Sequence, residues 1–272
     1  MKLGFIGTGN MASAIMGGII RNEVIPAEEI IGADLFAPGR ERVKSQFGIH
    51  VTDSNKEVAQ KAEVIILSVK PQFYADVIQD IKDEIKDNQI IITIAPGKTL
   101  SWLEEQFGKQ VKIVRTMPNT PAMVGEGMTA ACPNPYLNEE EIAYVKTLLQ
   151  SFSRVEIVPE RLMDVVVSVS GSSPAYVFVL IEAMADAAVS GGMPRAQAYQ
   201  FAAQAVLGSA KNGTGSGKAS WRAERYGMFP GRNYDRSSPC AGGAWIPQCG
   251  DRGNEGMRGD FQVACKRQKT RV

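Results

Sequence analysis

Histidine, cysteine and long apolar runs are all scarce in this chain of 272 residues. The single histidine, His50, argues against a Ser-His-Asp triad and against a histidine-rich metal centre, and a surface loop is its expected place. The four cysteines include no C-x-x-C pair, which argues against a zinc site and a disulfide framework. No apolar run approaches the roughly eighteen residues of a membrane span. The first strand-like run starts at Lys2, which leaves no space for a signal peptide. We therefore expect a cytoplasmic protein with no metal, no catalytic histidine and no membrane partner.

The charge is unevenly distributed along the chain. Residues 1–211 carry 19 Lys and Arg against 24 Asp and Glu, whereas residues 212–272 carry 11 against 5. The later segment also holds eight of the fifteen arginines and three of the four cysteines. This break in composition sets residues 212–272 apart from the rest.

Strand-like and helical runs alternate through the first part of the chain, which predicts βαβ units and a Rossmann-type doubly wound parallel sheet. The expected strands are 2–6, 29–34, 62–69, 89–94 and 111–116, with further short strands at 128–132 and 155–158. The expected helices are 11–20, 40–47, 74–85, 100–107 and 139–150. Two alanine-rich helical runs follow, at 172–190 and 194–211. We expect a dinucleotide-binding domain at 1–160 and the start of an all-helical domain at 161–211.

A glycine-rich motif, G-x-G-x-x-A, begins at Gly7 directly after the first strand. A helical run follows it, and the acidic residue Asp34 lies further along, which is the context of a dinucleotide-binding loop. Glycines let a pyrophosphate approach the backbone, and the free N–H groups at the start of the helix favour its negative charge. The motif therefore predicts binding of NADH or NADPH.

The choice between these two cofactors stays open in the sequence. Asp34 stands where a carboxylate accepts a hydrogen bond from a ribose 2′-hydroxyl, which would favour NADH. Arg40 and Arg42 follow closely and could instead pair with the 2′-phosphate of NADPH. Asp34 could also do no more than end a strand.

Two later stretches stand at the ends of strands, where ligands of such sheets lie. They are SVKPQ at 68–72 and RTMPNTP at 115–121. Lys70 and Asn119 offer polar groups for ribose, phosphate or carboxamide. Each stretch could equally be a loop that its prolines stiffen.

At these motifs the chain resembles the pyrroline-5-carboxylate reductases. The resemblance is carried by GFIGTGNM at 4–11, the two strand-end motifs, and VSGSSPAYVFVLIEAMADAAVSGGMPR at 169–195, and it covers about residues 1–211. The family usually has SGSGPAY, so Ser173 is a small departure. The resemblance implies reduction of the cyclic imine 1-pyrroline-5-carboxylate to L-proline, the last step of proline biosynthesis. It also implies a helical domain that dimerises, with further assembly common.

The resemblance also implies which residues form the site. Met117 and Asn119 would lie near the nicotinamide, and Ser172, opening a helix, would help to bind the substrate carboxylate through free N–H groups. No residue is expected to act as a strong acid, since a protonated imine is already electrophilic. The residues expected to hold the cofactor are Ile6, Gly7, Thr8, Gly9, Asn10, Met11, Asn55, Ser68, Val69, Lys70, Pro71 and Gln72.

The resemblance stops after Lys211. The family has more helix there and a serine-proline-glycine-glycine-threonine loop that contacts substrate, whereas this chain reads NGTGSGKASWRAERYGMFPGRN. Back-translated and read from the second base of each codon, residues 212 onward can spell MVLEAGKHPGELKDMVCSPGGTTIEA. This reading predicts that one extra base near the Lys211 codon puts residues 212–272 out of frame, with a loosely packed tail and impaired activity. A divergent natural tail, which its arginines would suit to RNA, is the alternative.

Three other functions fit parts of the sequence. A related imine or β-hydroxyacid reductase would share the architecture, although a β-hydroxyacid dehydrogenase would need a lysine on the helix 172–190, which has none. A regulatory protein could bind NAD(P) without turnover. A nucleic-acid binder would depend on the basic tail alone, and we expect no nucleic-acid partner.

Overall fold

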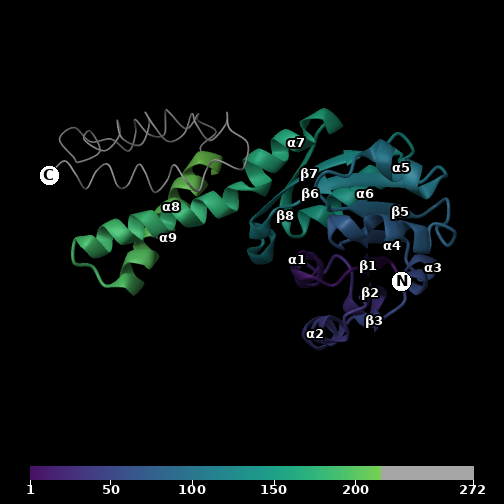
Figure 1. Cartoon of the computed structure of the whole chain (residues 1–272), viewed down its shortest axis with the longest axis horizontal. Helices are drawn as coiled ribbons and strands as arrows, with labels where there is room; N and C mark the ends of the chain where they lie inside the picture. The colour runs from purple at the N-terminus through teal and green to yellow at the C-terminus, as the bar shows by residue number, and fades with distance from the viewer. Residues whose placement is uncertain (216–272) are drawn as a thin grey trace. The chain divides into compact units, whose positions relative to one another are not determined.

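The computed structural model describes residues 1–215, and its first part is a single eight-stranded sheet (Figure 1). The strand order is β3-β2-β1-β4-β5-β6-β7-β8. The strands are β1 Leu3–Ile6, β2 Ile30–Ala33, β3 His50–Thr52, β4 Val64–Leu67, β5 Ile90–Thr93, β6 Lys112–Met117, β7 Gly127–Pro133 and β8 Ser153–Ile157. Strands β1, β2, β4 and β5 are buried along their whole length, as expected of strands covered on both faces.

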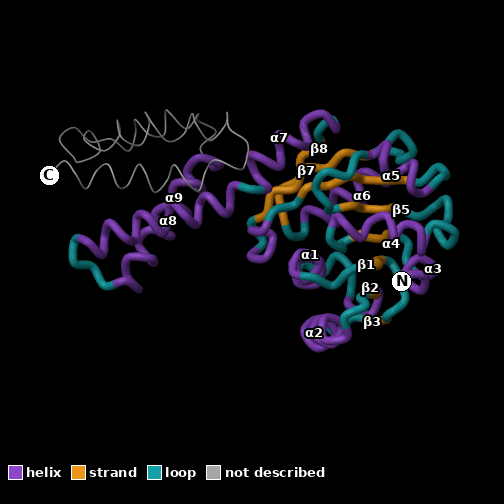
Figure 2. The backbone as a smooth tube through the Cα atoms, viewed as in Figure 1, coloured by secondary structure: helices purple, strands orange, loops and turns teal. Residues whose placement is uncertain are grey.

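Six helices cover the two faces of the sheet (Figure 2). They are α1 Asn10–Arg21, α2 Ala37–Phe47, α3 Asn55–Lys61, α4 Tyr74–Ile81, α5 Leu100–Phe107 and α6 Glu139–Gln150. One apolar cluster receives Ile15 of α1, Val43 of α2 and Val145 of α6. A second cluster receives Val58 of α3, Ile78 of α4 and Leu103 of α5. The doubly wound Rossmann architecture expected from the sequence is confirmed.

The sheet departs from parallel at one strand. β7 runs antiparallel to β6, with Met117 opposite Ala130, and β8 then runs parallel to β7. Between β6 and β7 the chain makes only a short 3₁₀ turn, Thr120–Val124, and a parallel crossover needs a dozen or more residues. The chain therefore turns straight back, and α6 supplies the crossover to β8.

Helices dominate after residue 160. A 3₁₀ turn at Glu160–Leu162, α7 Met163–Val166, a π-helical turn Val167–Gly171 and α8 Ser173–Ser190 follow one another without a break, and α9 is Arg195–Gly215. By its internal contacts the chain divides into a unit Met1–Leu180 and a unit that begins at Ile181. The expected boundary near 160 is a boundary of sequence character, and it stays a prediction.

The stretch Glu160–Ser190 is unusually apolar for a helix with open faces. Its mean hydropathy reaches 1.6, so it is long and apolar enough to cross a membrane by length and composition alone. Within α8 only Ala185 is buried, and within α9 only Ala198 and Ala202. Phe178 and Phe201 are 69% and 67% exposed. These helices therefore present apolar surface that a folded protein normally covers. The expectation that residues 212–272 are a loosely packed, out-of-frame tail lies, from residue 216 on, outside the described residues.

Candidate cofactor and substrate site

The glycine loop is tied to the end of a neighbouring strand. Gly7 has φ +98°, and a Cβ added to it would lie 2.8 Å from the Ser68 carbonyl carbon and oxygen. Glycine alone fits this position, since other residues would meet both backbone strain and a clash. The Ser68 hydroxyl donates to the Gly7 carbonyl at 2.7 Å. The carboxyl ends of β1 and β4 thus hold the loop in one place.

The second glycine leaves room for a ligand. A Cβ added to Gly9 would meet nothing within 4 Å, and Gly9 begins α1 with no side chain capping the helix. The first N–H groups of a helix have no partner within the helix, so they are open to an anion here. Ala12, the third position of the motif, is buried beneath the loop. The residues present therefore fit the pyrophosphate of a dinucleotide.

At the end of β2, Asp34 faces the glycine loop. Its Oδ2 accepts hydrogen bonds from the Thr8 backbone N–H at 2.8 Å and from the Thr8 hydroxyl at 2.9 Å, and its Oδ1 accepts from the Phe36 N–H at 3.0 Å. The guanidinium of Arg40 donates to the Asp34 carbonyl. Arg42 donates to the Thr8 carbonyl at 2.7 Å. Asp34, Arg40 and Arg42 therefore surround the loop where the adenosine ribose of a dinucleotide lies.

The SVKPQ stretch follows β4 as a short 3₁₀ turn, Pro71–Phe73. Val69 packs against the second core cluster, whereas Lys70 and Gln72 are exposed. Beneath the turn, the Tyr74 hydroxyl donates to the Leu67 carbonyl at 2.6 Å, and burial raises the pKa of this phenol above its ordinary value. The stretch is therefore firmly anchored and leaves its two polar side chains open.

Met117 and Asn119 lie against the π-helical turn. The Asn119 amide donates from Nδ2 to the Ser170 carbonyl at 3.0 Å and accepts at Oδ1 from the Met128 N–H at 2.9 Å. The Met117 methyl would lie 2.7 Å from a Cβ at Gly171, so that glycine permits the contact. The structure brings the ends of β6 and of the π-helical turn together. The expected contacts with nicotinamide stay a prediction, and the Asn119 amide is engaged by the protein.

Two expected residues lie differently from the sequence interpretation. Ser172 does not open a helix with free N–H groups, because it continues the π-helical turn and its own N–H donates to the Val167 carbonyl at 2.8 Å. That part of the expectation is wrong, and a role of Ser172 toward substrate stays a prediction. Asn55 begins α3, and its amide donates to the Asp80 carboxylate on α4 at 3.2 Å.

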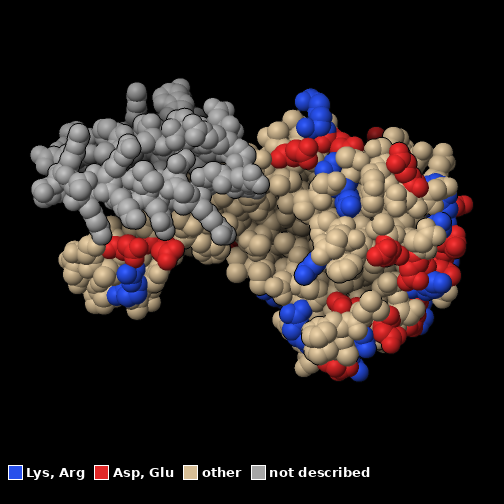
Figure 3. Space-filling view, viewed as in Figure 1, with Lys and Arg blue, Asp and Glu red and all other residues tan. Residues whose placement is uncertain are grey.

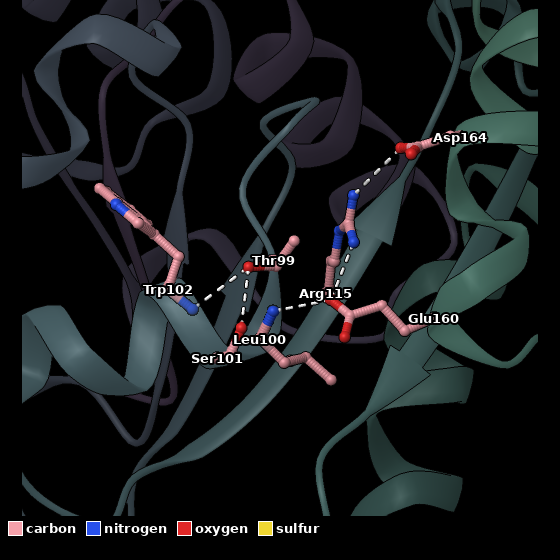
Figure 4. Close-up of polar contacts among 7 residues, drawn as sticks. All are labelled: Thr99, Leu100, Ser101, Trp102, Arg115, Glu160 and Asp164. Atoms are coloured by element: carbon pink, nitrogen blue, oxygen red, sulfur yellow. Dashed lines mark hydrogen bonds and ion pairs between the residues drawn. The ribbon is translucent and has the colours of Figure 1, made fainter.

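The sequence reasoning missed a buried charge cluster (Figure 4). The Arg115 side chain on β6, 5% exposed, pairs with Glu160 at 2.8 Å and with the exposed Asp164 at 3.8 Å. The same Glu160 oxygen accepts from the Leu100 N–H at 2.7 Å. Burial and the Glu160 carboxylate raise the pKa of the neighbouring Cys132 thiol. The cluster joins β6, the start of α5 and the segment that leads into α7.

Comparison with known proteins gives the family. A family profile described as "NADP oxidoreductase coenzyme F420-dependent" matches residues 2–97, and one described as "Pyrroline-5-carboxylate reductase dimerisation" matches residues 160–225. The pyrroline-5-carboxylate reductase of Escherichia coli is 47% identical over 214 residues, which cover 77% of this chain and 78% of that protein. The chain belongs to the pyrroline-5-carboxylate reductase family.

Solved structures of this family have the same fold. One from Coxiella burnetii, 28% identical, superposes with a TM-score of 0.84 over 91% of this chain and 92% of its own. One from Plasmodium falciparum, described with NADP bound and 27% identical, superposes with a TM-score of 0.80 over 99% and 97%. Members of the family are NAD(P)-dependent oxidoreductases that act on a CH–NH group. The expected family, enzyme class and NAD(P)H cofactor are confirmed.

Proposed function

We propose that this chain is built to reduce 1-pyrroline-5-carboxylate to L-proline, as a cytoplasmic enzyme of proline biosynthesis. The observation that carries the proposal is the open, uncapped start of α1 above Gly9, set beside the strand ends of β1, β2 and β4. This arrangement suits a dinucleotide, and the sequence around it is that of the family.

The chemistry asks little of the protein in acid or base. When bound, NAD(P)H supplies a hydride to the imine carbon, and the protonated imine nitrogen becomes the amine of proline. The tasks of the chain are then to bind, to align and to exclude water. The loop Ile6–Met11 and the stretch Ser68–Gln72 hold the cofactor, Met117 and Asn119 border the nicotinamide, and Ser172 contributes to the carboxylate site.

The apolar helices α8 and α9 serve assembly. Their exposed side chains include Val177, Phe178, Met184, Tyr199 and Phe201. We interpret this surface as the face that a second copy of the chain covers, rather than as a membrane span, because the family profile that matches it describes dimerisation. Residues 161–211 are on this proposal the start of the dimerisation and substrate domain.

We propose further that residues 212–272 are translated out of frame. The shifted reading restores the serine-proline-glycine-glycine-threonine loop, which the written chain lacks. The 214 residues aligned with the E. coli relative are close to the 211 that precede the break in composition. A similarity to the Methanosarcina acetivorans relative does extend over 89% of the chain. The proposal therefore needs a direct test.

The test is a paired assay of two chains with 1-pyrroline-5-carboxylate and either NADH or NADPH. One chain is as written, and the other comes from a gene with one base removed near the Lys211 codon. Activity at least about tenfold higher in the corrected chain, a difference of about 1.4 kcal/mol in the barrier, is expected. Equal activity in both would mean that the tail is native. Cofactor binding without turnover in either chain would favour a regulatory protein.

A further inference from the structure

The side chain of Asp34 is turned into the protein. A carboxylate that selects NADH must accept hydrogen bonds from the ribose hydroxyls. An ionised carboxylate has about four acceptor positions. Three of those on Asp34 are taken, two by Thr8 and one by the Phe36 N–H. Asp34 thus fastens the glycine loop to the end of β2, and this use explains its presence without a ribose.

Arg42 has the opposite character, because all its partners are uncharged. From α2 its guanidinium reaches the Thr8 carbonyl at 2.7 Å, the Ser13 hydroxyl at 3.3 Å and the Asn10 side-chain oxygen at 3.4 Å. Neither Arg42 nor Arg40 has a carboxylate within ion-pair distance in residues 1–215. The positive charge of Arg42 therefore remains available to an anion.

The local charge favours a phosphate over a hydroxyl. Arg40 donates to the backbone carbonyl of Asp34, so its charge stands beside that carboxylate and offsets it. Arg42 then leaves a net positive charge at the mouth of the loop. Basic side chains lie on the surface where α1 and α2 approach each other (Figure 3). A guanidinium matches the geometry of phosphate oxygens and forms stronger hydrogen bonds to them than to neutral groups.

We propose that this chain prefers NADPH to NADH, and that Arg42 is the residue that binds the 2′-phosphate, with Arg40 neutralising Asp34. This inference rests on the proposed cofactor site and goes beyond it in naming the specificity-determining residue. Hydrogen bonds to a charged group predict a preference of about 10- to 100-fold in Kd.

Direct titration tests the proposal without any turnover. The Kd values of NADPH and NADH are measured from nicotinamide fluorescence for the full chain, for Arg42→Gln and for Lys44→Gln. Lys44, exposed in the last turn of α2, is the matched control, because its replacement removes one positive charge from the same helix. We expect Arg42→Gln to raise the Kd of NADPH at least tenfold and to change that of NADH less than twofold. Lys44→Gln should change neither more than twofold.

A second measurement isolates the 2′-phosphate. Adenosine 2′,5′-bisphosphate should displace the reduced cofactor at least tenfold more effectively than AMP, and Arg42→Gln should abolish that difference. Circular dichroism confirms that each variant is folded. Equal Kd values for NADPH and NADH in the unaltered chain overturn this inference alone. Failure of both cofactors to bind overturns the cofactor site and this inference together.

Discussion

Single residues show where the motif predicted the site and where it did not. The glycines at 7 and 9 were predictable, since only glycine suits a positive φ against a neighbouring strand or an open approach to phosphate. The tether from Asn119 to Ser170 and the burial of Arg115 were not. Both join residues about fifty positions apart or less in the chain, and no local pattern marks such a pair.

The two glycines predict opposite effects of one small change. Gly7→Ala places a Cβ against the Ser68 backbone at positive φ, so we expect a loss of at least about 2 kcal/mol in the free energy of unfolding. Gly9→Ala meets nothing, so stability should stay within about 0.5 kcal/mol. Its methyl group occupies the space of the pyrophosphate, however, and should raise the cofactor Kd about tenfold. Urea unfolding and fluorescence titration measure the two effects, and comparable stability of both variants would contradict the argument.

At the scale of elements, strong periodicity predicted well and short elements did not. Helices α5 and α6 occupy the residues expected for them, because caps at Thr99 and Asn138 mark their starts. β3 and α3 were missed, since three and seven residues carry little periodic signal. The antiparallel β7 depends on the length of a connection rather than on the composition of the strand. The π-helical turn has no sequence signal that we can identify.

One contact between elements predicts a dependence on pH. Lys112 on β6 lies 2.5 Å from Glu141 on α6, and this hydrogen bond lowers the pKa of the Glu141 carboxyl. A lowered folded pKa means stability that is present above the unfolded value of about 4.3 and is lost as pH falls through the folded value. Lys112→Met should therefore lower the free energy of unfolding by about 0.5–1 kcal/mol at pH 7, and the deficit should shrink below pH ~4. Lys146→Met, exposed on the same helix, is the control, and a deficit that persists unchanged in acid would exclude this cause.

At the scale of the whole molecule, the two units have unequal support. The sheet buries its strands between two apolar clusters, whereas α8 and α9 keep large apolar side chains in contact with solvent. The sequence predicted helices there from alanine-rich runs, but helix positions do not say what covers them. The covering partner comes from another chain or from later residues, and neither leaves a local pattern.

Assembly gives the prediction at this scale. We expect the frame-corrected chain to form a dimer in light scattering, and the chain as written to remain monomeric or to aggregate. Phe178→Asp in the corrected chain removes a large apolar contact and should weaken the dimer at least about tenfold. Tyr136→Asp, which changes an exposed aromatic residue of the sheet unit, should leave the dimer intact. A stable dimer of the written chain would refute this account of the helices.

All eight strands come from the first 157 residues of the chain. During synthesis the sheet is therefore complete on the ribosome before the helices that follow it have emerged, and amino-terminal domains generally fold first. A change in the later part of the gene then leaves an already folded nucleotide-binding unit behind. Such a chain would still sequester reduced cofactor in the cell while consuming none of it.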